Sequence, residues 1–154
     1  MLHLSREAKM SNYVLRAAND SDIITVAKLL QKANAEVFPT RKQSTQLAYE
    51  FSVMNMLEDG TDIILSEIAG KVTGVLIGRQ DTFYNMLSPN YLVFLVYVET
   101  RHTKASYLLY HWAFKRAKEV GIPLETYAVS KDSRAFAKRN EENIVGYILK
   151  FEGK

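Results

Sequence analysis

The stretch Tyr91–Val98, YLVFLVYV, decides the fold of this chain together with the helical pattern that follows it at Thr103–Val120. An apolar run of this length is too short to span a membrane and is typical of a strand covered on both faces. Gly121 ends the helix, and a second β-prone segment follows at Leu124–Val129. Strand, helix and strand in succession predict a βαβ unit. We therefore expect these two strands to be parallel and Tyr91–Val98 to lie at the centre of the sheet.

Working outward towards the N-terminus, the pattern predicts a hairpin and, before it, two helices. Two β-rich runs, Asp62–Ala69 and Val72–Gly78, are separated by a tight turn at Gly70-Lys71. Apolar residues at helical spacing predict helices over Asp22–Ala35 and Ser44–Leu57, and the apolar set of the second helix is Leu47, Phe51, Met54 and Leu57. A short β-prone segment, Tyr13–Ala17, precedes both helices.

The C-terminal part completes a mixed α/β (α+β) domain. Ser133–Asn140 is expected to be a short helix and Ile144–Phe151 a last strand, so the order of elements is β-α-α-β-β-β-α-β-α-β. We expect one domain over residues 12–154, preceded by a flexible tail over residues 1–11. The tail contains a second methionine, Met10, so the native start is either Met1 or Met10.

Composition excludes several classes of protein. The 154 residues include 47% hydrophobic residues, which suffice for one core, and no cysteine, which excludes disulfides and thiolate sites and agrees with a cytoplasmic location. Basic and acidic residues, 20 and 17, are mixed along the chain, so nucleic-acid binding is not indicated. No secretory signal, membrane span or metal-ligand spacing is present, and we expect no metal.

The segment between the central strand and its helix reads Arg101-His102-Thr103-Lys104-Ala105-Ser106. In this position, and with this order of elements, it resembles the phosphate loop of the GNAT superfamily of acyl-CoA N-acyltransferases: Arg or Gln, two residues, Gly, one residue, Gly or Ala. Arg101 matches the first position and Ser106 is a small residue at the last, whereas Lys104 replaces the central glycine. The resemblance implies a GNAT-like three-layer fold in which the two parallel central strands splay apart around acyl-CoA.

This resemblance places the CoA phosphates at Arg101–Tyr107. Unpaired N–H groups and the positive end of the helix dipole would meet the pyrophosphate there. Cations in a first helical turn are mildly unfavourable without a nearby anion, which favours a ligand over plain surface charge. The residues expected to bind the cofactor are Val96, Val98, Arg101, His102, Thr103, Lys104, Ala105, Ser106 and Tyr107. His102 itself is expected to be a solvated loop side chain rather than a base.

The catalytic groups common in GNAT proteins are absent from their usual places. Ala137 stands where the family often has a thiolate-protonating tyrosine, and Asn90 stands near the position of a frequent basic glutamate. Substitute candidates are Tyr97, Glu99 and Tyr127, although a half-buried aromatic or a strand-end carboxylate would explain them equally well. The loop Arg79–Asn90 contains four large apolar residues and is either a lid or partner contact, or packing over the sheet edge: Phe83, Tyr84, Met86 and Leu87.

Two functions are therefore open, besides an unrelated α/β binding domain, which would require the order of elements to be a coincidence. The first is a transferase: a cytoplasmic N-acetyltransferase that moves an acetyl group from acetyl-CoA to an amine of a small molecule or a protein. The second is a catalytically degenerate GNAT-like module that binds CoA or a protein partner. The non-glycine phosphate loop also resembles divergent phage-encoded members of the superfamily. Neither reading requires a nucleic acid or membrane partner, and both allow a homodimer.

Overall fold

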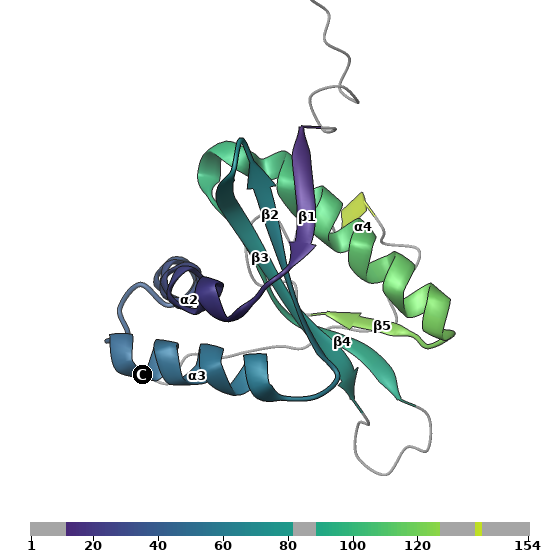
Figure 1. Cartoon of the computed structure of the whole chain (residues 1–154), viewed down its shortest axis with the longest axis horizontal. Helices are drawn as coiled ribbons and strands as arrows, with labels where there is room; N and C mark the ends of the chain where they lie inside the picture. Colours follow the sequence, from purple (N-terminus) through teal and green to yellow (C-terminus); the bar gives the residue numbers. More distant parts are fainter. Residues whose placement is uncertain (1–11, 82–88, 127–137, 140–154) are drawn as a thin grey trace, which may run out of the picture.

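Local sequence signals set most of the helix and strand boundaries. The computed structural model describes residues 12–81, 89–126 and 138–139, without the side chains of Arg101 and Thr103. The elements, drawn in Figure 1, are β1 (Tyr13–Ala17), η1 (Asp20–Asp22), α2 (Ile23–Val37), α3 (Thr45–Leu57), β2 (Thr61–Ile68), β3 (Lys71–Asp81), β4 (Asn90–Val98), η2 (Thr100–His102), α4 (Thr103–Val120) and β5 (Leu124–Thr126). The predicted order is confirmed as far as β5.

The five described strands form one mixed sheet in the order β1-β2-β3-β4-β5. All neighbouring pairs are antiparallel except β4 and β5, which are parallel as the βαβ pattern predicts. The middle strand of the five is β3 rather than β4, so the expected central position of Tyr91–Val98 is wrong for the described part. The reason is that the antiparallel strands β1, β2 and β3 all lie on one side of β4, and only β5 lies on its other side among the described residues. The predicted splaying of β4 and β5 falls beyond Thr126, outside the described residues.

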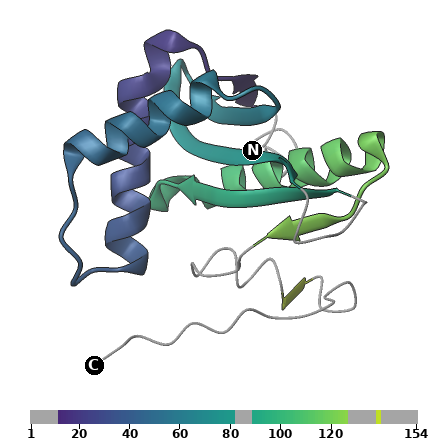
Figure 2. The ribbon, with the colours of Figure 1, turned by 90° about the horizontal axis from the view of Figure 1, so that it is seen from below.

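The sheet separates two helical layers (Figures 1 and 2). Leu109 of α4 packs with Leu76 and Val93 on one face, and Val26 of α2 packs with Leu65 on the other. Helix α3 contacts α2 rather than the middle of the sheet, and in Figure 2 it runs across α2. The result is the three-layer arrangement that the sequence predicts.

Two helix ends and one hairpin turn show how local sequence signals set the element boundaries. Helix α3 begins where the Ser44 side chain accepts a hydrogen bond from the backbone of Leu47, and α4 ends at Gly121 with φ +77°. The β2–β3 turn is one residue earlier than predicted, at Ala69-Gly70. Both residues have positive φ, 51° and 76°, as a two-residue type I′ turn requires, and this geometry leaves Lys71 to pair with Ile68.

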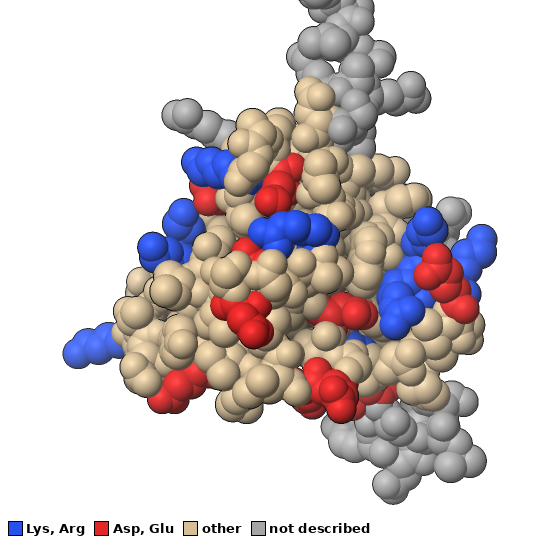
Figure 3. Space-filling view, viewed as in Figure 1, with Lys and Arg blue, Asp and Glu red and all other residues tan. Residues whose placement is uncertain are grey.

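Several predictions lie outside the described residues. These are the tail, the loop residues 82–88, most of the helix Ser133–Asn140 and the whole strand Ile144–Phe151. The division into a tail and one domain thus stays a prediction. No helix within the described ranges has the length and hydropathy to cross a membrane. In Figure 3 basic and acidic side chains are interspersed on the face shown, in agreement with the mixed charge of the sequence.

Candidate functional site

The carboxyl half of β4 carries the first of the predicted site residues, and a β-bulge decides where they point. Ile77 of β3 pairs with Leu95, but the next residue, Gly78, pairs with Val93, so Phe94 has no partner in β3. Phe94 and Leu95 consequently both contact the α2 side of the sheet. The extra residue shifts the alternation of side chains in the rest of the strand.

After the bulge, Val96 and Val98 point towards α4. Val98 is 7% exposed and packs in the same cluster as Ala105 of α4. Both side chains therefore help to anchor the strand to the helix, and Val98, which is buried, can offer only its backbone to a ligand. Backbone contact between the strands is unusually close here, because a Cβ on Gly74 of β3 would lie 2.8 Å from Val98 Cγ2 and 2.9 Å from the Tyr97 carbonyl oxygen. Glycine at this position lets the two strands approach.

The start of α4 has no side-chain cap. Its N-cap residue, His102, makes no side-chain cap hydrogen bond, and neither does Asp22 at the start of α2, whereas Ser44 caps α3 and Asn19 caps the short 3-10 helix η1. The helix also has no acidic residue in its first turn, and Lys104 is exposed there. A helix start of this kind is suited to an anion, because the N–H groups and the dipole both favour negative charge.

His102 differs from its expected solvated state. The side chain is half-buried, and its Nδ1 lies 2.8 Å from the hydroxyl oxygen of Tyr13, with the two rings edge to face. The His102 backbone N–H also donates to the Glu99 carbonyl oxygen at 2.8 Å. The histidine therefore ties the start of α4 to β1, which is far away in the sequence. Spacing along the chain gives no signal for a contact of this kind.

The remaining loop positions divide between core and surface. Ala105 is fully buried and Ser106 is half-buried, so Ala105 can offer only its backbone to a ligand. Tyr107 is 48% exposed and stacks on His111 one turn later, with ring centroids 6.2 Å apart. Within the predicted set, Lys104 and Tyr107 are thus the exposed side chains that the structure describes.

Two of the three catalytic candidates are brought together on the α2 side of β4. Burial, and after it the carboxylates of Glu36 and Glu99, raise the pKa of Tyr97, which keeps its hydroxyl protonated. Glu99 forms an ion pair with Lys32 of α2, with Nζ and Oε1 3.4 Å apart. The raised pKa therefore argues against Tyr97 as a base and makes its hydroxyl a weaker acid than an ordinary tyrosine. Tyr127 lies outside the described residues.

The structure adds a carboxylate that the sequence analysis missed. The Asn90 side-chain amide donates to Glu125 Oε2 at 3.2 Å, because the parallel register brings the first residues of β5 beside the start of β4. Asn90 cannot ionise, but its neighbour can. The signal was available in principle, since the predicted βαβ unit places the starts of both strands side by side.

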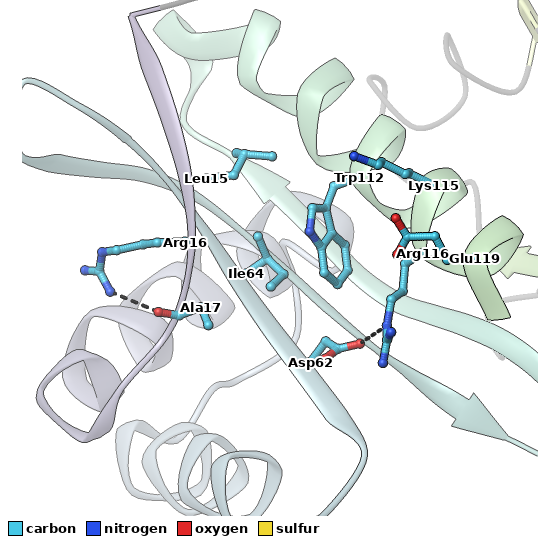
Figure 4. A pocket seen from close by; sticks show the side chains of 9 residues that line it. All are labelled: Leu15, Arg16, Ala17, Asp62, Ile64, Trp112, Lys115, Arg116 and Glu119. Atoms are coloured by element: carbon cyan, nitrogen blue, oxygen red, sulfur yellow. Dashed lines mark hydrogen bonds and ion pairs between the residues drawn. The ribbon is translucent and has the colours of Figure 1, made fainter.

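A hollow of about 440 Å³ lies elsewhere, between β1, β2 and the second half of α4. Figure 4 shows the Trp112 ring and Ile64 forming its floor, with Asp62 and Arg116 facing each other. The Asp62 carboxylate already accepts a hydrogen bond from the Tyr91 hydroxyl at 2.6 Å and pairs with Arg116 Nε at 3.5 Å. The Asp62 carboxylate is thus bonded within the chain, and the hollow is separate from the start of α4. In the described ranges, no group of three histidine or acidic side chains is placed to hold a metal ion.

Comparison with solved structures identifies the arrangement. A predicted acetyltransferase with acetyl-CoA from Clostridium acetobutylicum superposes with a TM-score of 0.73 at 13% identity, over 91% of this chain and 96% of that one. The fold is that of the GNAT acyltransferases. The aminoglycoside N-acetyltransferase AAC(6')-Iy in complex with CoA gives 0.68 at 9% identity over 92% and 93% of the two chains. The ribosomal-protein-alanine N-acetyltransferase from Brucella melitensis biovar Abortus 2308 gives 0.66 at 14%, over 90% and 99%. No family model and no curated protein matches the sequence.

Proposed function

We propose that this chain binds acetyl-CoA with the phosphates at the start of α4 and transfers the acetyl group to an amine of a small molecule or a protein. The observation that carries the proposal is the uncapped, basic start of α4 directly after the bulged strand β4. The GNAT fold supports it, because two of the structures that share this fold contain CoA or acetyl-CoA.

The proposal assigns a part to each group. The pyrophosphate accepts hydrogen bonds from the N–H groups of the first turn of α4, and Arg101 and Lys104 add positive charge. Tyr97, whose raised pKa keeps it protonated, protonates the departing CoA thiolate. Free CoA and an N-acetylated amine are the products. The amine must lose a proton as the bond forms, and Glu99 is the nearest carboxylate to Tyr97 along the strand.

A binding experiment tests the cofactor site. We expect calorimetry to show binding of acetyl-CoA and CoA, with affinity reduced about ten- to hundredfold by Lys104→Glu, because charge-assisted hydrogen bonds to phosphate are each worth this much. Arg101→Glu should have a similar effect. Lys115→Glu is the matched control, since this exposed lysine lies on the same helix but three turns from its start. Equal loss in all three variants would contradict a site at the helix start.

A second experiment decides between the enzyme and the noncatalytic module. The chain has no cysteine, so a thiol reagent detects released CoA without background from the protein. We expect CoA release with at least one amine from a panel of small amines, aminoglycosides and peptide N-termini, and slower release by Tyr97→Phe with unchanged acetyl-CoA affinity. Tight binding without release from any amine would instead support the module, in agreement with the non-ionisable Asn90.

A further inference from the structure

Helix α3 carries its apolar stripe on the outside. The set that the sequence marks as the apolar face of this helix points to solvent, with exposed fractions of 64% for Leu47, 37% for Phe51, 65% for Met54 and 76% for Leu57. A surface helix normally turns such a stripe towards the core. Among the described residues nothing covers it.

The buried face of α3 explains the orientation. Ala48 packs against Ala27 and Leu30 of α2, where a small residue allows the two helices to approach closely. The two polar residues on this face bond to their own helix: Ser52 Oγ donates to the Ala48 carbonyl oxygen and Asn55 Nδ2 to that of Phe51, both at 2.8 Å. Burial of these polar groups therefore leaves no unpaired donor. The helix cannot turn its stripe inward without replacing this fitted face by four large side chains.

The exposed area of the stripe is comparable to that of the apolar core of a protein–protein interface. Taking about 200 Å² for each complete side chain, the four exposed fractions add up to roughly 480 Å² of surface. Apolar patches of this size on a single chain commonly mark interaction sites, and a standard interface takes about 800 Å² from each partner. The stripe alone supplies roughly three-fifths of that area.

The charges beside the stripe indicate what the partner is. Lys42 precedes α3 and Asp59 follows it, and both are exposed. In Figure 3 the surface over α3 has a basic side chain at its left end and acidic side chains along its lower edge, with uncharged surface between them. If a second copy of α3 lies antiparallel to the first, each Lys42 meets the partner's Asp59, so the surface is complementary to itself. Opposed helix dipoles favour the same orientation.

We propose that α3 is the surface through which two copies of this chain associate, as an antiparallel helix pair about a two-fold axis between Phe51 and Met54. Phe51 then contacts the partner's Met54, and Leu47 contacts the partner's Leu57. Such an isologous contact closes after two copies and buries the whole stripe. The proposal does not depend on acetyl-CoA binding.

Sedimentation velocity over a range of protein concentrations tests the association. We expect the full chain to dimerise reversibly in the micromolar range and Met54→Glu to remain monomeric at concentrations at least tenfold higher. Val14→Glu is the matched control, because this valine is 58% exposed and belongs to β1, a strand that lies away from α3 in Figure 1. A wild-type chain that stays monomeric throughout overturns the proposal. If Met54→Glu then also melts at a lower temperature, residues of the same chain cover the stripe.

Charge reversal tests the antiparallel orientation. Lys42→Glu should weaken dimerisation several-fold, because two repulsive contacts with the partner's Asp59 form in each dimer. The double variant Lys42→Glu with Asp59→Lys should return to the wild-type dissociation constant. Equal affinity in all three proteins, or no recovery in the double variant, would exclude this orientation.

Disulfide trapping tests the register. Since the chain has no cysteine, single variants Phe51→Cys and Met54→Cys carry one thiol each. Mixed and oxidised, they should form the mixed dimer in preference to a mixed dimer of Phe51→Cys with Gln31→Cys, a control on α2. Equal yields for the two mixtures would contradict a two-fold axis between Phe51 and Met54.

Discussion

Replacing Tyr91 by phenylalanine removes one hydroxyl from the centre of the structure and nothing else. Tyr91 is 1% exposed, and its hydroxyl donates to Asp62 Oδ2 at 2.6 Å. The ring fits against Gly78, where a Cβ would lie 2.9 Å from the ring carbon Cε1, so phenylalanine fills the same space. The substitution therefore isolates one charge-assisted hydrogen bond without creating a cavity in the core.

The expected loss of unfolding free energy follows from the surroundings of Asp62. A hydrogen bond to a charged group contributes about 1.5–3 kcal/mol. The Asp62 side chain is 27% exposed and keeps Arg116 at 3.5 Å, so water and the guanidinium partly replace the lost hydroxyl. We expect a loss of about 1–2 kcal/mol, which lowers Tm by roughly 2–8 °C in a chain of this size.

The pH dependence provides a second, independent signature. Burial, and then the hydrogen bond to Asp62, raise the pKa of the Tyr91 hydroxyl far above its ordinary value. A group whose pKa is higher in the folded state stabilises fully below its unfolded pKa, about 10, and loses that contribution as the pH rises further. Between about pH 10 and 12 the wild type should therefore lose about 1.4 kcal/mol per pH unit that the Tyr91→Phe variant does not lose.

Urea unfolding at pH 7 and at several values above pH 10 measures both effects. Circular dichroism is the suitable signal, because the single tryptophan, Trp112, contacts the Tyr91 ring. Tyr49→Phe is the control for the other tyrosines, since Tyr49 is 43% exposed. Unchanged stability at pH 7, or a gap between wild type and Tyr91→Phe that stays constant above pH 10, would refute the role given to this hydroxyl.

Two further predictions concern the sheet and the first helix. Gly74→Ala should lower the free energy of unfolding by about 1–3 kcal/mol, because the new Cβ would overlap Val98 of the strand that leads into α4. The same change should lower the affinity for acetyl-CoA. Urea unfolding measures the first effect and calorimetry the second, and an unchanged free energy of unfolding would contradict the close approach. Asp22→Asn should lower the free energy of unfolding by about 1–3 kcal/mol. The two guanidinium nitrogens Nη1 and Nη2 of Arg16 donate to the two oxygens of the buried Asp22 carboxylate at 2.7 Å and 2.8 Å, and this lowers the pKa of Asp22. A lowered pKa stabilises above the unfolded value, about 3.9, so this cost should shrink as the pH falls below 4; a constant difference down to pH 2.5 would exclude the linkage.

Much of the local structure was predictable because its causes are local. Ser44 and Gly121 mark helix ends by contacts within one turn, and the apolar run of β4 and the pattern of α4 together predict a parallel pair of strands. The errors were small where the competing cause was also local. The β2–β3 turn moved by one residue because both of its central residues, Ala69 and Gly70, must adopt positive φ.

The candidate site was predictable only in part. Sequence analysis located the start of α4 at Thr103, while its use as a phosphate site stays a prediction. The β-bulge at Phe94, the bond between His102 and Tyr13, and the amide of Asn90 beside Glu125 were not predicted. The bulge depends on strand register, and the bond between His102 and Tyr13 depends on how the start of α4 packs against β1; no pattern within one segment determines either. The contact of Asn90 with Glu125 required the exact register of the predicted parallel pair.

The sequence by itself determined the order of helices and strands and the place of the basic helix start after β4. Hydrogen bonds within a turn and the steric preferences of single residues suffice for these features. Only the tertiary structure decided which side of α3 is buried. Periodicity marks Leu47, Phe51, Met54 and Leu57 as one face of a helix, but it cannot tell whether that face meets the core of the same chain or another surface. The packing of Ala48 against Ala27 and Leu30 of α2 buries the opposite side of α3 and leaves the apolar face exposed.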